Sequence, residues 1–310
     1  MGGGVKLAAW ILFSLPLSAG TYYVTVAGLG GDPEYEQRFQ AWAKEIDKLV
    51  KAGGEVAQSE VLYGPEATRA RLETVLRGVA GEVKPADDLV LMLIGHGGVD
   101  GREYKMNLPG PDITATYLAE LLDRIPAARQ LVVNMTSASG GSIDVLRKPN
   151  RAVITATKSG TERNATIFAR YWVEALRDPA ADADKNETVS ALEAFRYASE
   201  KTTRFYETQK RLATEHALLE DTGSGEGVRT PSAENGEGLL AARFSLIRMG
   251  TAQTAARTPE KQKLLAKRES LEQQIDRLKY QKAAIPAAEY RKLLGVLLLE
   301  LAKTQAEIDK

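Results

Sequence analysis

Two repeating patterns of apolar residues alternate along the chain after its first twenty residues. Short runs of Val, Ile, Leu and Tyr bounded by Gly, Pro or Asp are typical of buried strands, and they cover 22–27, 56–62, 89–94, 131–135 and 152–157. Longer segments repeat apolar residues at helical spacing, and they cover 35–51, 67–80, 114–124 and 164–176. Each helical segment joins two strands and is long enough for a right-handed crossover. The pattern predicts an α/β domain with a mainly parallel sheet and helices on both faces.

The last third of the chain has a different pattern. Residues 222–238 are rich in Gly, Ser, Glu, Thr and Pro, which predicts an exposed linker, and 239–247 predicts a returning edge strand. Beyond it, apolar residues recur at heptad-like spacing on both sides of a break at Pro286: Leu264, Leu271, Ile275 and Leu278 before it, and Tyr290, Leu294, Leu297, Leu301 and Ile308 after it. This predicts a helical hairpin or coiled-coil tail over 251–310, which docks on its own domain or associates with another chain.

The first twenty residues are typical of a secretory signal peptide. A cation at Lys6 precedes an apolar run from Leu7 to Leu17, and small residues follow up to Gly20. The run is too short to cross a hydrocarbon core of roughly 30 Å, so we expect cleavage near Gly20 and no membrane span in the mature protein. The domains predicted are a signal over 1–20, an α/β domain over 21–250 and the tail.

Composition narrows the chemistry that this chain can perform. It has no cysteine, which excludes disulfides, thiolate metal sites and a cysteine nucleophile. Its 41 basic and 41 acidic side chains balance, which argues against a general nucleic-acid binder. An exported chain without disulfides is typical of a bacterial periplasm, so we expect a secreted or periplasmic protein.

Candidate chemistry follows two of the predicted strands. One strand leads into Gly95-His96-Gly97-Gly98, and the next leads into a stretch of hydroxyls and glycines over 136–142. Ligands gather at the carboxyl edge of parallel strands. A base on one loop and hydroxyls on its neighbour suit nucleophilic acyl transfer, with loop amides as an oxyanion hole. A turn histidine beside a flexible anion-accepting loop is the alternative.

The segment from Ala86 to Gly97 resembles the caspase-like peptidases, and within them the legumain-like branch, through its aspartates, apolar strand and His-Gly. Aligning Ser139-Gly140 with the Ser-Gly that follows the family's catalytic cysteine places Ser137 at the nucleophile position, with Thr136 and Ser139 as alternative nucleophiles. The resemblance implies that His96 is the catalytic base and that the amides of Gly97 and Ser137 form the oxyanion hole. It implies the caspase-like version of the α/β fold.

The segment 155–163 looks like the stretch that lines the specificity pocket in this family. The resemblance implies that Glu162 or Arg163 contacts a substrate side chain, and ordinary surface charge is the alternative.

Serine at the cysteine position bears on activity, because a hydroxyl is a far weaker acid than a thiol and needs an oriented base. No carboxylate that would orient His96 is evident; Asp100 is close only in sequence. We therefore expect a proteolytically impaired peptidase homologue that binds a peptide or protein in the cell envelope. The alternative is an active serine-dependent peptidase or esterase with a His96/Ser137 dyad.

A twelve-residue stretch has the oxygen donors of an EF-hand calcium loop. Donors stand at positions 1, 3, 5, 7, 9 and 12: Asp182, Asp184, Asn186, Thr188, Ser190 and Glu193. This spacing predicts a Ca²⁺ site, the only cofactor expected. Position six is Glu187, where the sharp turn prefers glycine. The alternative is a turn that caps the next helix, with Ser190 as N-cap and Glu193 three residues later.

Overall fold

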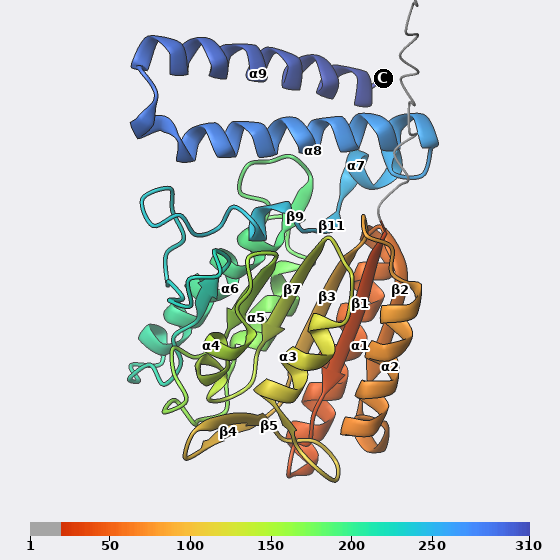
Figure 1. The fold of residues 1–310 in the computed structure, drawn as a ribbon, viewed down its shortest axis with the longest axis vertical. Helices are drawn as coiled ribbons and strands as arrows, with labels where there is room; N and C mark the ends of the chain where they lie inside the picture. The colour runs from red at the N-terminus through yellow and green to blue at the C-terminus, as the bar shows by residue number, and fades with distance from the viewer. Residues whose placement is uncertain (1–19) are drawn as a thin grey trace, which may run out of the picture.

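A computed structural model describes residues 20–310, so the predicted signal peptide over 1–20 lies, except for Gly20, outside the described residues. The centre is a six-stranded sheet in the order β10-β8-β7-β3-β1-β2 (Figure 1). All neighbours pair in parallel except β10, which is antiparallel to β8. The strands are β1 (Thr21–Ala27), β2 (Val56–Leu62), β3 (Asp88–Ile94), β7 (Arg129–Asn134), β8 (Arg151–Thr155) and β10 (Leu218–Glu220).

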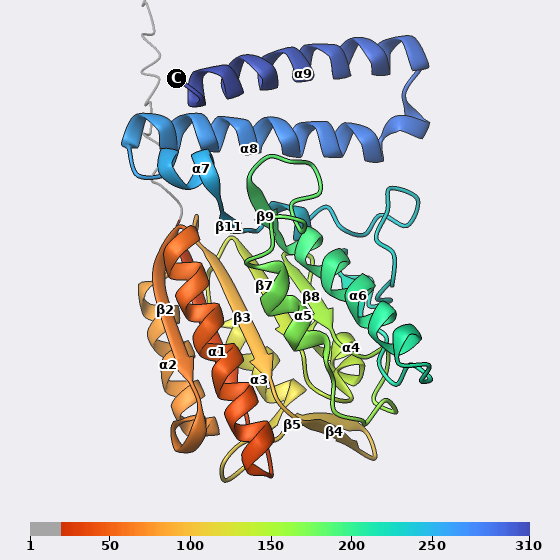
Figure 2. The same cartoon turned by 180° about the vertical axis from the view of Figure 1, so that it is seen from behind.

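Helices cover both faces of the sheet, as Figures 1 and 2 show from opposite sides. One layer holds α1 (Pro33–Gly53), α5 (Phe168–Ala175) and α6 (Ala191–Thr208); the other holds α2 (Arg69–Glu82), α3 (Ala115–Asp123) and α4 (Ile143–Leu146). The sequence of strand β3 is apolar at successive positions because both of its faces are covered. Val90 and Met92 pack into the first layer, whereas Leu89 and Leu91 pack into the second. The predicted α/β domain with a mainly parallel sheet is confirmed.

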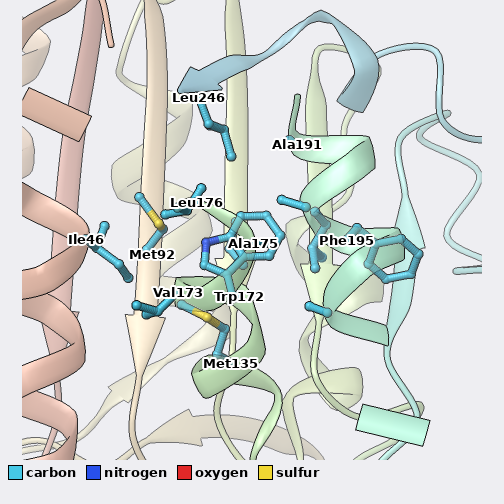
Figure 3. Close-up of a cluster of buried hydrophobic side chains, with 14 of the residues drawn as sticks. Ile46, Met92, Met135, Trp172, Val173, Ala175, Leu176, Ala191, Phe195 and Leu246 are labelled. Carbon is cyan, nitrogen blue, oxygen red and sulfur yellow. The ribbon is translucent and has the colours of Figure 1, made fainter. Parts of the chain in front are cut away.

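The core of the first layer is built around Trp172 of α5 (Figure 3). Its indole is fully buried, and Met92, Met135, Ile46 and Phe195 surround it in the same cluster. These side chains come from the sheet and from three helices. The tryptophan therefore ties the helical layer to the strands whose ends carry the candidate site.

Several small elements depart from the predicted pattern. A three-stranded sheet of β4 (Gly97–Asp100), β5 (Glu103–Met106) and β6 (Ile113–Thr114) directly follows His96. The prediction of an edge strand over 239–247 is wrong: β11 (Ser245–Arg248) pairs with β9 (Thr188–Ser190) in a separate ribbon, and β10 takes the sheet edge. The short helices are η1 (Gly64–Glu66), η2 (Ser139–Ser142), η3 (Ala241–Arg243), η4 (Lys282–Ala284) and α7 (Gly250–Ala255).

The segment 222–238 is largely exposed, as its composition predicts, but it is also anchored at both ends. Asp221 is buried and accepts hydrogen bonds from the backbone amides of Gly238, Leu240 and Ala241, each at 2.8 Å. Glu237, also buried, accepts the Asp221 amide at 2.6 Å. Asp221 and Glu237 thus satisfy buried backbone amides at the two ends of the segment, which composition alone does not reveal.

The C-terminal helical hairpin is confirmed, and it docks on the domain. Helix α8 (Pro259–Tyr280) lies along the amino ends of the strands, and α9 (Ala287–Ile308) packs on its outer side (Figure 1). Arg248 is buried between Glu269 of α8, at 2.7 Å, and Glu55 of the domain, at 3.1 Å. Tyr280 donates to the Glu237 carbonyl at 2.6 Å. These contacts make the tail part of one packed body.

The heptad positions of α8 form its buried face, with Leu265 rather than Leu264 as the fully buried residue of the first turns. The surface of α9 leaves four large apolar side chains exposed: Leu293, Val296, Leu298 and Leu299. Association of this surface with another helix stays a prediction. Within residues 20–310, no helix combines the length and apolar character that crossing a bilayer requires.

Candidate functional site

The carboxyl ends of β3, β7 and β8 form one edge of the sheet, and we call this edge, with loops 95–98, 135–142 and 156–163, the rim. Strands β3 and β7 are direct neighbours, and Leu93 pairs with Asn134 at their ends. His96 and Ser137 follow these two strands and therefore reach the same edge. Gly97, next to the histidine, is within hydrogen-bond distance of Ser137. The fold thus brings the two predicted loops together.

The His96 ring is turned towards α1. It packs edge-on against Tyr35, with ring centroids 4.8 Å apart, and against Phe39, at 5.2 Å. Burial lowers the pKa of His96 below its ordinary value, while the Gly30 carbonyl and the charges of Asp32 and Glu36 act in the opposite direction. The neutral imidazole is favoured, which is the form that a general base needs.

Asp100 does not orient this ring. It lies on the surface and pairs with Lys105 across the β4–β5 hairpin. The carboxylates whose charges act on His96 are instead those of Asp32 and Glu36, at the start of α1.

The hydroxyl of Ser137 is held by the backbone of Gly97. It accepts a hydrogen bond from the Gly97 amide at 3.1 Å and donates one to the Gly97 carbonyl at 3.2 Å. Ser137 is only 2% exposed. The Gly97 amide expected in the oxyanion hole therefore already has an acceptor. Across residues 20–310, no hydrogen bond joins the His96 ring to Thr136, Ser137 or Ser139.

The alternative nucleophiles, Thr136 and Ser139, are buried in hydrogen-bond networks. Thr136 Oγ1 lies 2.5 Å from Tyr104 Oη and 2.8 Å from Asn134 Oδ1. Ser139 Oγ accepts the Thr157 amide at 3.1 Å. Both side chains are fully buried. They fix the loop in place, and neither presents a hydroxyl to solvent.

Two backbone features keep this loop close to its neighbours. Ala138 has a left-handed φ of 55° directly after Ser137, a conformation that side chains other than glycine adopt at a cost. A Cβ at Gly97 would lie 2.8 Å from both the Ser137 carbonyl oxygen and Tyr104 Oη, whereas one at Gly98 would meet nothing within 4 Å. Gly97 is therefore required for the close approach that the Ser137 hydrogen bonds need.

Glu162, predicted to line a specificity pocket, holds the second histidine. Its carboxylate contacts His216 Nδ1 and accepts the His216 amide at 3.1 Å and the Lys158 amide at 2.9 Å. The Glu162 carbonyl in turn accepts the Ala138 amide at 2.7 Å. Arg163 is exposed. The 156–163 loop thus connects the Ser137 loop to His216.

His216 is not among the site residues predicted from the sequence. It stands 54 positions from Glu162, and no local motif surrounds it. The sequence offers one indication of a role for His216, because the chain has only two histidines.

The predicted calcium loop brings three of its carboxylates together. Asp182, Asp184 and Glu193 offer oxygens that all lie within 4.8 Å of one another. Partial burial and the charge of Glu193 raise the pKa of Asp184 to about 6, which indicates crowded negative charge. Glu187, at position six, adopts a left-handed φ of 62° and supplies the turn that glycine usually makes.

The same loop also caps α6. Ser190 and Glu193 form the reciprocal capping box, and Glu193 additionally accepts the Ala183 amide at 2.9 Å. Asp182 accepts the amides of Asn186 and Glu187 at 3.1 and 3.0 Å. The capping alternative therefore describes the loop as it stands, and Ca²⁺ binding stays a prediction.

Helix α8 adds a fourth carboxylate, Glu272, which no sequence motif indicates. Burial, together with the charges of Asp184 and Glu269, raises the pKa of Glu272 to about 7 despite the nearby Arg268. Arg268 is buried, and its guanidinium donates to Thr188 Oγ1 at 3.1 Å. The acidic loop and the docked tail are thus in electrostatic contact.

Comparison with known proteins finds similarity to solved structures, and three of these are 11–13% identical to this chain in sequence. Two caspases are among them. Caspase-1 of Spodoptera frugiperda has a TM-score of 0.45 and 13% identity and covers 66% of this chain and 87% of its own. The Drosophila initiator caspase Dronc has a TM-score of 0.40 and 12% identity, and the match covers 67% of this chain and 81% of Dronc. A structural-genomics protein from Geobacter sulfurreducens has a TM-score of 0.45 and 11% identity, and the match covers 75% of this chain and 99% of that protein.

No family model matches the chain. No curated protein matches it either. The legumain-like branch and the replacement of cysteine by serine therefore stay predictions from the sequence.

Proposed function

We propose that this chain is an exported, peptidase-related scaffold that binds a peptide or protein at the rim and hydrolyses it slowly or not at all. The observation that carries the proposal is the double hydrogen bond between the Ser137 hydroxyl and the backbone of Gly97. The absence of cysteine from the whole sequence supports it.

The hydrogen bonds of Ser137 oppose each step of acyl transfer. A nucleophilic hydroxyl must pass its proton to a base as it attacks, but the Ser137 proton is directed at the Gly97 carbonyl, 3.2 Å away. The Gly97 amide would have to stabilise the oxyanion, but it donates to Ser137 Oγ. Both bonds must break before attack, and the His96 ring must leave its contacts with Tyr35 and Phe39.

A serine-dependent peptidase or esterase is the second candidate. The adjacency of β3 and β7 favours it, because one side-chain rotation of Ser137 would free its hydroxyl beside a loop that carries a neutral imidazole. In that case His96 acts as general base and Ser137 as nucleophile.

Labelling with a fluorophosphonate probe separates the two candidates. The intact protein is treated beside the variant Ser137→Ala and a matched control, Ser224→Ala, at an exposed serine. We expect no label that depends on Ser137 and no cleavage of a peptide library, with or without calcium. Labelling that Ser137→Ala removes and Ser224→Ala retains would establish the serine hydrolase instead.

The variant Ser137→Cys tests the binding role of the rim. A thiol is a stronger acid than a hydroxyl, so the variant should either cleave library peptides or retain them by mass spectrometry. If it neither cleaves nor retains any peptide while remaining folded, the rim is not a peptide site.

Export forms a separate part of the proposal and is supported by the residue pattern over 1–20 alone. Those residues, fused to a reporter that folds only outside the cytoplasm, should make the reporter active. A Leu→Arg change in the apolar run is the matched control. A reporter that stays inactive in the unaltered fusion would remove the envelope from the proposal.

A further inference from the structure

The surface of α9 that α8 leaves uncovered carries a cluster of exposed apolar side chains. Helix α9 is the outermost helix in both views of the fold (Figures 1 and 2). Val296 and Leu299 are each 57% exposed, and Leu293, one turn before Val296, is 42% exposed. A groove of about 390 Å³ between α8 and α9 adjoins this cluster, with Leu278 and Leu297 in its wall. Clustered apolar side chains on a surface mark a site of association.

Charged residues flank this cluster on the same face of α9. Glu289 and Lys292 precede it, and Glu300 and Lys303 follow it. Steps of three and four residues join these four positions through Val296, so they share one side of the helix. Within residues 20–310, Glu289 and Lys292 form no ion pair, whereas Glu300 pairs with Lys303 at 2.9 Å. The first two charges are therefore available to a partner.

The order of these charges is complementary to its own reverse. Glu289 and Lys303 each stand seven positions from Val296, and Lys292 and Glu300 each stand four. When two copies of α9 lie antiparallel with Val296 opposite Val296, each of these acids lies opposite a base of the other copy. A two-fold interface needs this property, because residue i of one copy contacts residue j of the other, and j contacts i.

The neighbouring alignments of the two helices lack this complementarity. Sliding one copy by three residues in one direction brings Lys292 opposite Lys303, and in the other direction brings Glu289 opposite Glu300. Like charges that face each other across an interface are unfavourable. The charges therefore select one alignment of α9 with itself, and this symmetry points to a second copy of the chain rather than to an unrelated protein.

We propose that two copies of this chain associate through α9, antiparallel, with Val296 at the two-fold axis. Leu293 of each copy then lies opposite Leu299 of the other. Burial of the apolar cluster favours association, and the flanking charges fix the alignment. Because the hairpin lies at the amino ends of the strands, the dimer leaves both rims uncovered (Figure 1). The inference does not depend on any chemistry at the rim.

The absence of cysteine from the sequence makes cross-linking a direct test. In the mature chain, Val296→Cys places two thiols at the axis, and mild oxidation should join two copies through a disulfide. Ala302→Cys, at an exposed position on another side of α9, is the matched control and should run as a monomer on a denaturing gel. Val296→Cys that cross-links no faster than Ala302→Cys would overturn the proposal.

Sedimentation velocity over a concentration series tests the alignment. The unaltered chain should dimerise, and Lys292→Glu should raise the dimer dissociation constant about tenfold, because symmetry repeats the change in two pairs. Adding Glu300→Lys restores opposite charges and should return most of the affinity. Arg291→Glu, the same change on another side of α9, should have no effect. A monomer at every concentration, a double variant no tighter than Lys292→Glu, or equal weakening by Arg291→Glu would contradict the proposed dimer.

Discussion

Glu215 offers a quantitative test of the packing beside the rim, through the variant Glu215→Gln. The carboxylate is 3% exposed and accepts the Ile167 amide at 2.9 Å, the Phe168 amide at 3.1 Å and the Tyr206 hydroxyl at 2.9 Å. Burial raises its pKa from the ordinary 4.5 to about 7, even though these hydrogen bonds lower it. Folding therefore favours the protonated carboxyl.

The sign and size of the pH effect follow from this pKa. A raised pKa gives stability that is fully present below pH 4.5 and is lost as the pH rises through 7. At about 1.4 kcal/mol per pKa unit, a change from 4.5 to about 7 corresponds to a loss of roughly 3 kcal/mol by pH 8. Glutamine has no proton to release, so Glu215→Gln should lack this loss. Any fixed penalty of the new amide cancels when two pH values are compared.

Urea unfolding followed by fluorescence of the buried Trp172 measures the effect. Between pH 4.5 and 8, the unfolding free energy of Glu215→Gln relative to the wild type should rise by about 3 kcal/mol. Glu226→Gln, at an exposed glutamate, is the control and should follow the wild type. Parallel curves for Glu215→Gln and the wild type would show that Glu215 has an ordinary pKa and that the burial argument fails.

Three further predictions concern the rim, the sheet and the acidic loop. Gly97→Ala should lower the unfolding free energy by about 1–3 kcal/mol, whereas Gly98→Ala should change it little; equal urea midpoints would contradict the close packing. In the native protein, Arg129 donates through Nε to Asp88 at 2.8 Å, and Asp88→Asn removes this charge partner. We expect the unfolding free energy measured in urea to fall by about 3 kcal/mol. A fall below about 0.5 kcal/mol would show that the ion pair contributes no more than a surface pair. Calcium at 100 times its Kd should stabilise chelator-treated protein by about 2.7 kcal/mol in thermal unfolding, and Asp184→Asn should abolish the gain; no gain in the wild type would end the calcium prediction.

The apolar pattern predicted the main sheet because its central strands, β1, β3, β7 and β8, are buried on both faces. Residues 56–62 coincide with β2, and 22–27 and 89–94 each fall one residue short of a strand. Helix α5 begins at Phe168 rather than 164 because its first amides are held by Glu215, far along the chain. Strand β10 has three residues, too few for any periodicity, and only its pairing with β8 defines it.

The sequence placed the two loops of the rim but not the direction of their side chains. Strand adjacency brings His96 and Ser137 to one edge, and that follows from topology alone. The ring direction depends on Tyr35 and Phe39, whose positions are set by the packing of α1. The contact of Glu162 with His216 likewise joins two segments that meet only in the folded chain.

Helix α8 and the rim lie at opposite ends of the central sheet. The contacts of α8 lie where the strands begin, and Arg129, the first residue of β7, donates to the Arg243 carbonyl at 2.8 Å beneath it. The loops of His96 and Ser137 lie where the strands finish, roughly 23 Å away for a seven-residue strand. A protein bound at the α8 end would leave the rim sterically open, and the reverse also holds. The chain therefore has room for two different binding partners at the same time.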